Sequence, residues 1–178
     1  MNKILLGAFA LAFSCGTAFS QKSMIGVDIA ATGQMPVGDF ADAAGFGVGG
    51  LGGVEVGMYP GLELTARSGY IYHFKKNDLV FSQIPILGGA QFTIPMSPLY
   101  VEGELGAVIA RSEYSSGSTY ATSSTSTKTN FGWDAGVGSL VGPVDIRLTF
   151  NVLDASHSGN SMTLGLTFGF EIWGTKEM

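Results

Sequence analysis

Two groups of residues in this chain are of types that could carry chemistry, and the first is a serine–histidine pair. His157 stands beside Ser158 in the segment "ASHSGNS" at residues 155–161. A serine acts as a nucleophile only when a histidine lies within about 2.6–3.2 Å of it and a third group orients that histidine. A serine-rich segment supplies such neighbours by chance, so we expect no catalytic residue here.

The second group consists of charged residues that alternate with apolar ones. Eight are carboxylates and two are arginines, namely Asp28, Glu55, Glu63, Arg67, Glu102, Glu104, Asp134, Asp145, Arg147 and Glu171. A charge inside a protein must be paired or hydrated, so one interpretation is a polar network in which each arginine serves more than one acid. The alternative is a row of acids that lines a narrow cation-preferring channel or a proton-linked gate.

The spacing of these charges predicts β-strands. In "PVDIRLTFNV" at residues 143–152, Val144, Ile146 and Leu148 alternate with Asp145 and Arg147. A period of two places the apolar side chains on one face of a strand and the polar ones on the other. Eight segments show strand character, at Met24–Thr32, Gly45–Met58, Leu62–Phe74, Leu79–Ile94, Leu99–Tyr114, Asn130–Val141, Val144–Asp154 and Ser161–Trp173.

The connections between these segments alternate in length. Those at residues 59–61, 95–98 and 142–143 are tight and contain proline, and the longer ones are Gly33–Ala44, Lys75–Asp78, Ser115–Thr129 and Ala155–Asn160. This rhythm is typical of barrels with short turns at one end and longer loops at the other.

Two places disturb the predicted strands. Pro85 lies inside the fourth segment and cannot donate a ladder hydrogen bond, so we expect a β-bulge near it. The run Gly49–Gly53 leaves the second segment with few side chains to set its register.

The composition indicates which face meets which solvent. Charged residues make up 13% of the chain, and 27 of its 178 residues are glycine. Ordinary soluble domains have about 25% charged residues and roughly 7% glycine. The polar face is mostly glycine, threonine and other small residues, which suits the narrow interior of a small barrel. We therefore predict an all-β, eight-stranded antiparallel up-and-down transmembrane β-barrel; the alternative is a soluble barrel with the apolar face inside.

The first twenty residues have the features of a secretory signal. Lys3 precedes an apolar run, and Ala18 and Ser20 form a small-x-small cleavage site. We predict a signal peptide at residues 1–20 and one barrel domain at 21–178, exported through the Sec pathway. The alternative is a lipoprotein signal that is cleaved before Cys15.

No cysteine follows the predicted signal, which excludes disulfides and thiolate metal sites from the mature chain. The formal net charge of −5 is opposite to that of most nucleic-acid binders, so we expect no nucleic-acid partner. We expect no cofactor and no metal site.

Three segments carry a resemblance to a known family. These are "GQMPVGDF" at residues 33–40, "GFGVGG" at 45–50 and "QIPILGGAQF" at 83–92. They resemble the small outer-membrane β-barrel domain family of Gram-negative bacteria, which includes the transmembrane domain of outer-membrane protein A. The resemblance implies a protein of the bacterial outer membrane, in contact with outer-membrane lipid and lipopolysaccharide, and we expect a monomer. With the short turns on the periplasmic side and the longer loops outside, the alternation of connection lengths predicts that both termini lie in the periplasm.

The last predicted strand carries a second resemblance. Thr163, Gly165, Phe168 and Phe170 match the polar-x-Gly-x-x-hydrophobic-x-hydrophobic signal that the barrel-assembly machinery reads. This signal usually ends on an aromatic residue at the chain end, whereas here the chain continues from Glu171. The barrel-assembly machinery is therefore an expected partner.

The segment around His157 is similar in part to the outer-membrane lipid A deacylases. Their motif has histidine, one residue, then serine and asparagine, but Gly159 stands where that serine would be. We predict a non-enzymatic outer-membrane protein with a structural or surface-interaction role and a lumen closed by its charge network. The alternatives are a narrow cation-preferring channel and a lipid A-modifying enzyme.

Overall fold

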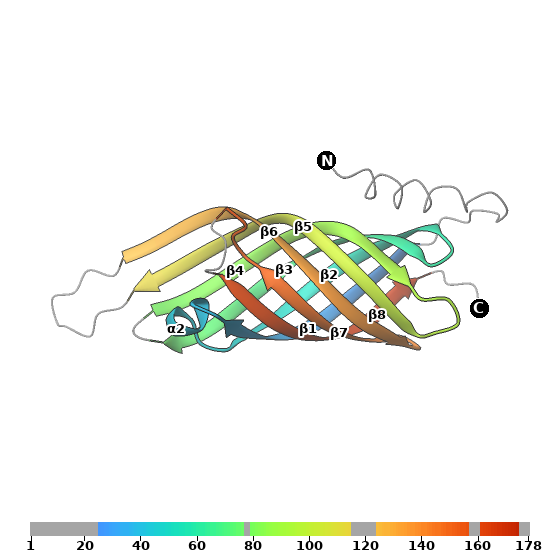
Figure 1. Ribbon diagram of the computed structural model, residues 1–178, viewed down its shortest axis with the longest axis horizontal. Coiled ribbons are helices and arrows are strands. Elements are labelled where there is room, and N and C mark those ends of the chain that lie inside the picture. The colour runs from blue at the N-terminus through green and yellow to red at the C-terminus, as the bar shows by residue number, and fades with distance from the viewer. Residues whose placement is uncertain (1–24, 77–78, 115–123, 157–160, 175–178) are drawn as a thin grey trace.

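The computed structural model describes residues 25–76, 79–114, 124–156 and 161–174 of the chain (Figure 1). The predicted signal at residues 1–20 and the pair His157 and Ser158 lie outside these ranges. Eight strands form a closed barrel in which each strand pairs with its sequence neighbours and β1 pairs with β8. The strands are β1 (Ile25–Val37), β2 (Gly47–Tyr59), β3 (Leu62–Lys76), β4 (Leu79–Thr93), β5 (Leu99–Tyr114), β6 (Ser124–Val141), β7 (Val144–Val152) and β8 (Met162–Gly174).

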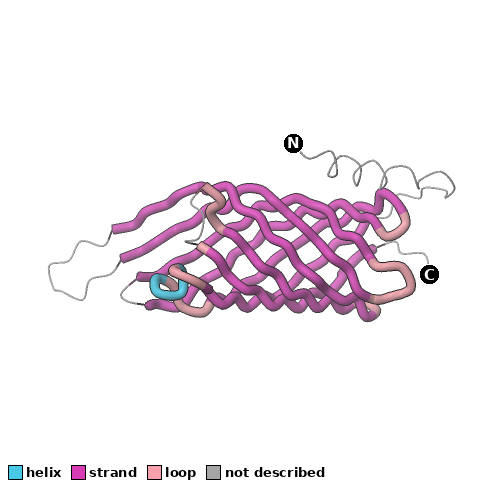
Figure 2. Tube along the Cα trace, viewed as in Figure 1, coloured by secondary structure: helices cyan, strands magenta, loops and turns pink. Residues whose placement is uncertain are grey.

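Every pairing between neighbouring strands is antiparallel, so the predicted up-and-down barrel is confirmed. Figure 2 shows the strands crossing the barrel wall obliquely, with the helical turn α2 (Phe40–Ala43) at one end. The tight turns between β2 and β3, between β4 and β5, and between β6 and β7 gather at the opposite end. We call these the loop end and the turn end.

The boundary of the sixth strand differs from the prediction. We expected a loop at Ser115–Thr129, but β6 begins at Ser124 and its first residues pair with β5, from Tyr114↔Ser124 to Ile109↔Thr129. Threonine accepts strand geometry readily because its β-branched side chain fits a pleated surface, and the partner strand supplies the hydrogen bonds. The β5–β6 hairpin therefore extends past the rest of the barrel at the loop end (Figure 1).

Two other predicted loops are also shorter than expected. β1 continues to Val37, into the segment predicted as a loop, and part of the remainder of that segment forms α2. β3 continues to Lys76 and β4 starts at Leu79. Hydrogen bonds to neighbouring strands extend β1 and β3 beyond the residues where the hydrophobic alternation ends.

The predicted bulge at Pro85 is wrong. The pairing of β4 with β3 keeps one register on both sides of the proline, from Ser68↔Ile86 to Ile71↔Gln83. The pairing with β5 passes through Pro85↔Val108 without a shift. The barrel accommodates the missing donor by losing local pairing to β3, and no residue is inserted.

The glycine run in β2 holds a single register with both neighbours, including Thr32↔Gly49 and Gly49↔Ile71. A Cβ added to Gly49 would lie 2.3 Å from the carbonyl oxygen of Tyr70. The neighbouring backbone leaves no room for a side chain at this position.

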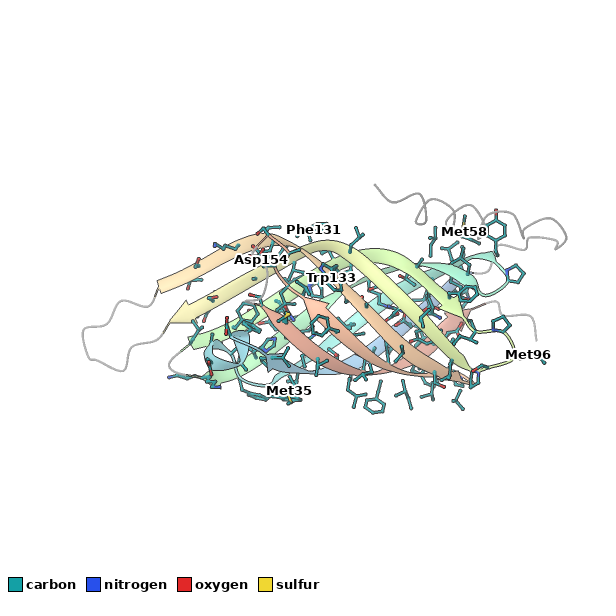
Figure 3. The ribbon with its side chains drawn as sticks, viewed as in Figure 1. Met35, Met58, Met96, Phe131, Trp133 and Asp154 are labelled. Carbon is teal, nitrogen blue, oxygen red and sulfur yellow. The ribbon has the colours of Figure 1, made fainter. Side chains whose placement is uncertain are left out.

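The two faces of the strands meet opposite environments. In β7, Leu148 is 53% exposed on the outer face, whereas Arg147 is 3% exposed inside. Large apolar side chains point outward around the barrel, as at Met35 and Met58 in Figure 3. The soluble alternative is therefore wrong, because the apolar row covers the outside of the barrel. Within the described residues, no helix has the length and apolar character needed to cross a bilayer.

The two adjacent glycines of β4 provide a test of this arrangement. A Cβ at Gly89 would lie 2.0 Å from the backbone oxygen of Gly103, whereas at Gly88 the nearest atom, the oxygen of Thr65, is at 3.6 Å. We predict that Gly89→Ala destabilises the barrel by about 1–3 kcal/mol through overpacking. Gly88→Ala is the control and is expected to be neutral or to stabilise by up to about 1 kcal/mol, because alanine restricts the unfolded chain.

Equilibrium unfolding in denaturant of the wild type and both variants measures these effects. Equal unfolding free energies for Gly88→Ala and Gly89→Ala would contradict the assigned faces of β4.

Candidate functional site in the barrel lumen

Arg67 on β3 joins acids from two other strands. Its Nη1 atom donates to Glu102 Oε2 at 2.7 Å and to Glu104 Oε1 at 2.8 Å, both on β5. Its Nη2 atom lies 3.4 Å from Glu55 Oε1 on β2. The hydroxyl of Thr65 also donates to Glu104. One guanidinium therefore neutralises carboxylates from both sides of β3, including two that lie beyond β4.

Arg147 on β7 forms the second centre of charge pairing. Its Nη2 atom donates to Asp145 Oδ2 at 2.7 Å, and its Nε atom lies 3.5 Å from Glu102 Oε1. Glu102 thus lies between the two arginines and connects their ion pairs into one network. Asp145 also accepts a hydrogen bond of 2.6 Å from the hydroxyl of Tyr100.

Sequence reasoning missed Tyr100 as a member of this network. It lies on the same face of β5 as Glu102 and Glu104 and is almost fully buried. A Cβ at Gly138 would lie 2.2 Å from Tyr100 Cζ, so this glycine makes room for the tyrosine ring. The period-two pattern of β5 contained the signal, because it assigns Tyr100 to the inner face.

The structure places the predicted charged residues along the inner face, and they differ in their hydrogen-bond and ion-pair partners. Six of the ten form the ion pairs just described: Glu55, Arg67, Glu102, Glu104, Asp145 and Arg147. Glu63 accepts a hydrogen bond of 3.4 Å from Gln91 Nε2. Glu171 lies toward the turn end, where its Oε1 would be 3.5 Å from a Cβ on Gly26. Asp28 and Asp134 are both buried, and each has an oxygen with no hydrogen-bond partner among the described residues.

A second set of polar side chains, all uncharged, lines the lumen toward the loop end. Gln83 Nε2 donates to Gln34 Oε1 at 2.6 Å across the barrel, from β4 to β1. The hydroxyls of Thr167 and Thr32 are 2.9 Å apart. Asn151 Nδ2 donates to the hydroxyl of Thr163 at 3.2 Å. Sequence reasoning singled out only charged residues and so missed this layer.

A cavity of about 40 Å³ lies among these polar groups. Its lining includes Arg67, Glu104, Asp134 and Arg147 of the charge network and Gln83 and Asn151 of the neutral layer. A cavity of this size holds a few water molecules at most. Side chains therefore occupy most of the interior at this level.

Apolar residues cover the loop end of the lumen. Phe40 on α2 is buried and packs edge-on against Phe81 at 5.1 Å and His73 at 5.9 Å between ring centroids. His73 is fully buried, and its Nδ1 lies 3.0 Å from the carbonyl oxygen of Gly45. Lys76 Nζ donates to the carbonyl oxygen of Ala41 and ties α2 to β3. We call Phe40, Ala44, Phe81, Val108, Ala110 and Leu153 the apolar cap.

The described residues contain no group of three or more histidine, cysteine, aspartate and glutamate side chains that could hold a metal ion. What the lumen provides is a set of ion pairs, a neutral polar layer and an apolar cap. This arrangement can brace the barrel and restrict passage through it.

Solved structures of other proteins share this architecture, whereas comparisons of the sequence find no match. No family model matches the sequence, and no curated protein matches it. Among solved structures, the attachment invasion locus protein Ail of Yersinia pestis matches with a TM-score of 0.61 and 14% identity, covering 85% of this chain and 99% of that one. Neisserial surface protein A matches with a TM-score of 0.58 and 15% identity, covering 84% of this chain and 98% of that one.

The chain has the fold of the small eight-stranded outer-membrane β-barrels. The N-terminal β-barrel domain of OprF from Pseudomonas aeruginosa also shares this barrel fold, with a TM-score of 0.56, 14% identity, and coverage of 85% of this chain and 100% of that one. At such low identity the similarity is one of fold alone. The resemblance of fold predicted from the sequence is confirmed.

The buried ion pairs of this barrel should matter far more than the exposed one. Arg67→Met removes the cation that Glu102 and Glu104 share, and leaving buried acids unpaired costs about 3–5 kcal/mol. The matched control is Arg111→Met. Arg111 pairs with Glu113 at 2.6 Å, but its side chain is 56% exposed, so its loss should cost only about 0–1 kcal/mol.

Denaturant unfolding of both variants beside the wild type measures the difference. A cost for Arg67→Met no greater than that for Arg111→Met would show that the lumen network does not stabilise the fold.

Proposed function

We propose that this chain is a non-enzymatic outer-membrane β-barrel protein with a structural or surface-interaction role. The observation that carries the proposal is the distribution of side chains: apolar residues such as Leu148 cover the outside, and buried ionised residues such as Arg67 and Arg147 lie in the lumen. A bilayer accepts such a barrel because the strands pair their backbone groups within the wall and the charges are kept from lipid.

The sequence supports the route to that membrane. We propose that residues 1–20 direct Sec export and are removed, and that the barrel-assembly machinery reads the signal in β8. Phe168 and Phe170 point outward with 53% and 49% exposure, whereas Thr163 is fully buried, as that alternating signal requires. The mature protein should fractionate with outer membranes and need detergent for extraction, and its recovery as a soluble periplasmic protein would overturn the proposal.

The surface-interaction part of the proposal rests on the β5–β6 hairpin. Residues 125–129 of β6 are exposed and carry threonine, serine and Lys128 beyond the main wall of the barrel. The proposed surroundings are outer-membrane lipid and lipopolysaccharide, with the barrel acting as a monomer. Ail, which shares the fold, has also been crystallised with the heparin analogue sucrose octasulfate, so a barrel of this shape can bind a polyanion.

The membrane assignment predicts a dependence on depth along β7. Leu148 lies in the middle of the strand, and Val152 lies at its loop end. Leu148→Arg should cost about 2–4 kcal/mol and Val152→Arg only about 0–1 kcal/mol, because a charge on the lipid face is penalised most at the bilayer centre. Thr149→Ala, on the lumen face, is the control and should have a modest effect.

Reversible folding into lipid vesicles measures all three variants. Equal, large penalties at Leu148 and Val152 would mean that this face does not contact lipid.

We also propose that the lumen is closed. Three features in series support closure: the ion pairs around Arg67, the neutral layer around Gln83 and the apolar cap. The rival function is a narrow cation-preferring channel, and it is favoured by the oxygens of Asp28 and Asp134 that find no donor among the described residues, because carboxylates attract cations.

Conductance in planar bilayers separates the two functions. We predict small or absent steady currents for the wild type and also for Phe40→Ala, because the charge network still closes the lumen when the cap is weakened. Phe46→Ala is the control, since Phe46 is exposed and belongs to the outer surface. Large, steady cation currents from the wild type would contradict closure and support the channel.

A further inference from the structure

Two carboxylates of the lumen face each other across the pairing of β5 and β6. Glu104 and Asp134 are directly paired residues in this ladder. Both point inward and are buried, with 3% and 8% exposure. Directly opposed residues on antiparallel strands hold their Cβ atoms about 4.5–5.5 Å apart, and like charges in such positions destabilise the pair.

The two carboxylates differ in their partners. Glu104 accepts hydrogen bonds from Arg67 Nη1 at 2.8 Å and from the hydroxyl of Thr65. Asp134 has its Oδ1 atom buried, and this atom finds no hydrogen-bond donor anywhere in the described part of the chain. The Nη atoms of Arg67 donate to Glu102, Glu104 and Glu55, whereas its buried Nε finds no acceptor among the described residues.

The balance of charged groups around Asp134 also indicates that positive charge is missing there. The charged groups that act on it are Glu102 and Glu104 from β5, Arg67 from β3 and Arg147 from β7. Among these described groups, two guanidinium groups stand against three largely buried carboxylates, and the same two arginines also pair with Glu55 and Asp145. Buried charge must be compensated, so these side chains leave a deficit of positive charge at this level of the lumen.

The space beside Asp134 limits what can fill that deficit. Asp134 and Glu104 both line the cavity of about 40 Å³, together with Thr149 and Asn151, whose side chains offer neutral oxygens. A space for a few water molecules admits a small ion and is too small for a bulky organic cation. The absence of a three-ligand group of histidine, cysteine and acids within the described ranges argues against a transition metal.

We propose that Asp134 and this cavity form a binding site for one monovalent cation, either a proton on the Asp134 carboxyl or a sodium ion in the cavity. The bound cation removes the repulsion between Asp134 and Glu104 and gives Asp134 Oδ1 a partner. The site depends on the lumen geometry and not on the proposed surface role, so loss of that role would leave it standing.

Two measurements on the chain folded into detergent micelles distinguish the two cations. For the proton, the infrared spectrum at neutral pH should contain the carbonyl band of a protonated carboxylic acid, and Asp134→Asn should weaken that band. For sodium, replacing N-methylglucamine chloride by sodium chloride at constant ionic strength and pH 8 should raise the thermal unfolding midpoint of the wild type. Asp134→Asn should remove that rise.

Glu63→Gln serves as the matched control. Glu63 is an inward carboxylate that accepts a hydrogen bond from Gln91 and does not line the cavity, so its variant should keep the wild-type response. Glu104→Gln is a second test should Asp134→Asn fail to fold. It removes the opposing charge and should reduce the cation response while Asp134 is intact.

The proposal is overturned if the wild type shows neither response. It is also overturned if Asp134→Asn keeps whichever response the wild type shows, or if Glu63→Gln loses that response to the same extent.

Discussion

The pairing of Arg67 with Glu102 and Glu104 is the interaction on which the interior of this barrel depends. An eight-stranded barrel encloses a space that side chains just fill, so no bulk water is at hand to solvate an ionised group. Arg67 is buried and reaches β5 past β4, which lets one cation neutralise acids that the strand order keeps apart. Glu102 also pairs with Arg147 on β7 and so connects the two arginines.

Some glycines in the strands make room for the large polar side chains of the lumen. Gly138 makes room for the ring of Tyr100, and Gly53 makes room for Asp28, whose Oδ2 would be 2.2 Å from an added Cβ. These two glycines stand where large polar side chains enter the lumen, whereas a Cβ at Gly49 or Gly89 would meet neighbouring backbone. At the loop end an apolar side chain fills the lumen: Phe40, which lies on α2 and not on a strand, packs against Phe81.

The outer face obeys a simpler rule, since no other part of the described chain covers it. Leu148, Phe168 and other apolar residues alternate outward along the strands, and a lipid-like environment is what would shield them. The barrel thereby reverses the usual arrangement of a soluble protein, with its polar network inside and its hydrophobic surface outside. Closure of β1 on β8 makes this possible, because it removes the free edges that an open sheet would expose to lipid.

The sequence by itself determined the strand count, the strand order and the two faces. Alternation is a local property, so Asp145 and Arg147 could be assigned to one face and Leu148 to the other from spacing alone. The same alternation predicted ten charged residues for the inner face. Pairing between strands is not local. Pairing with β5 extends β6 to Ser124, and the pairing of β4 with β3 keeps one register on both sides of Pro85 without a bulge. Only the tertiary structure decided which acid each arginine meets and that Asp134 Oδ1 finds no donor among the described residues, because those contacts depend on how the closed barrel brings β3, β5, β6 and β7 around one narrow space.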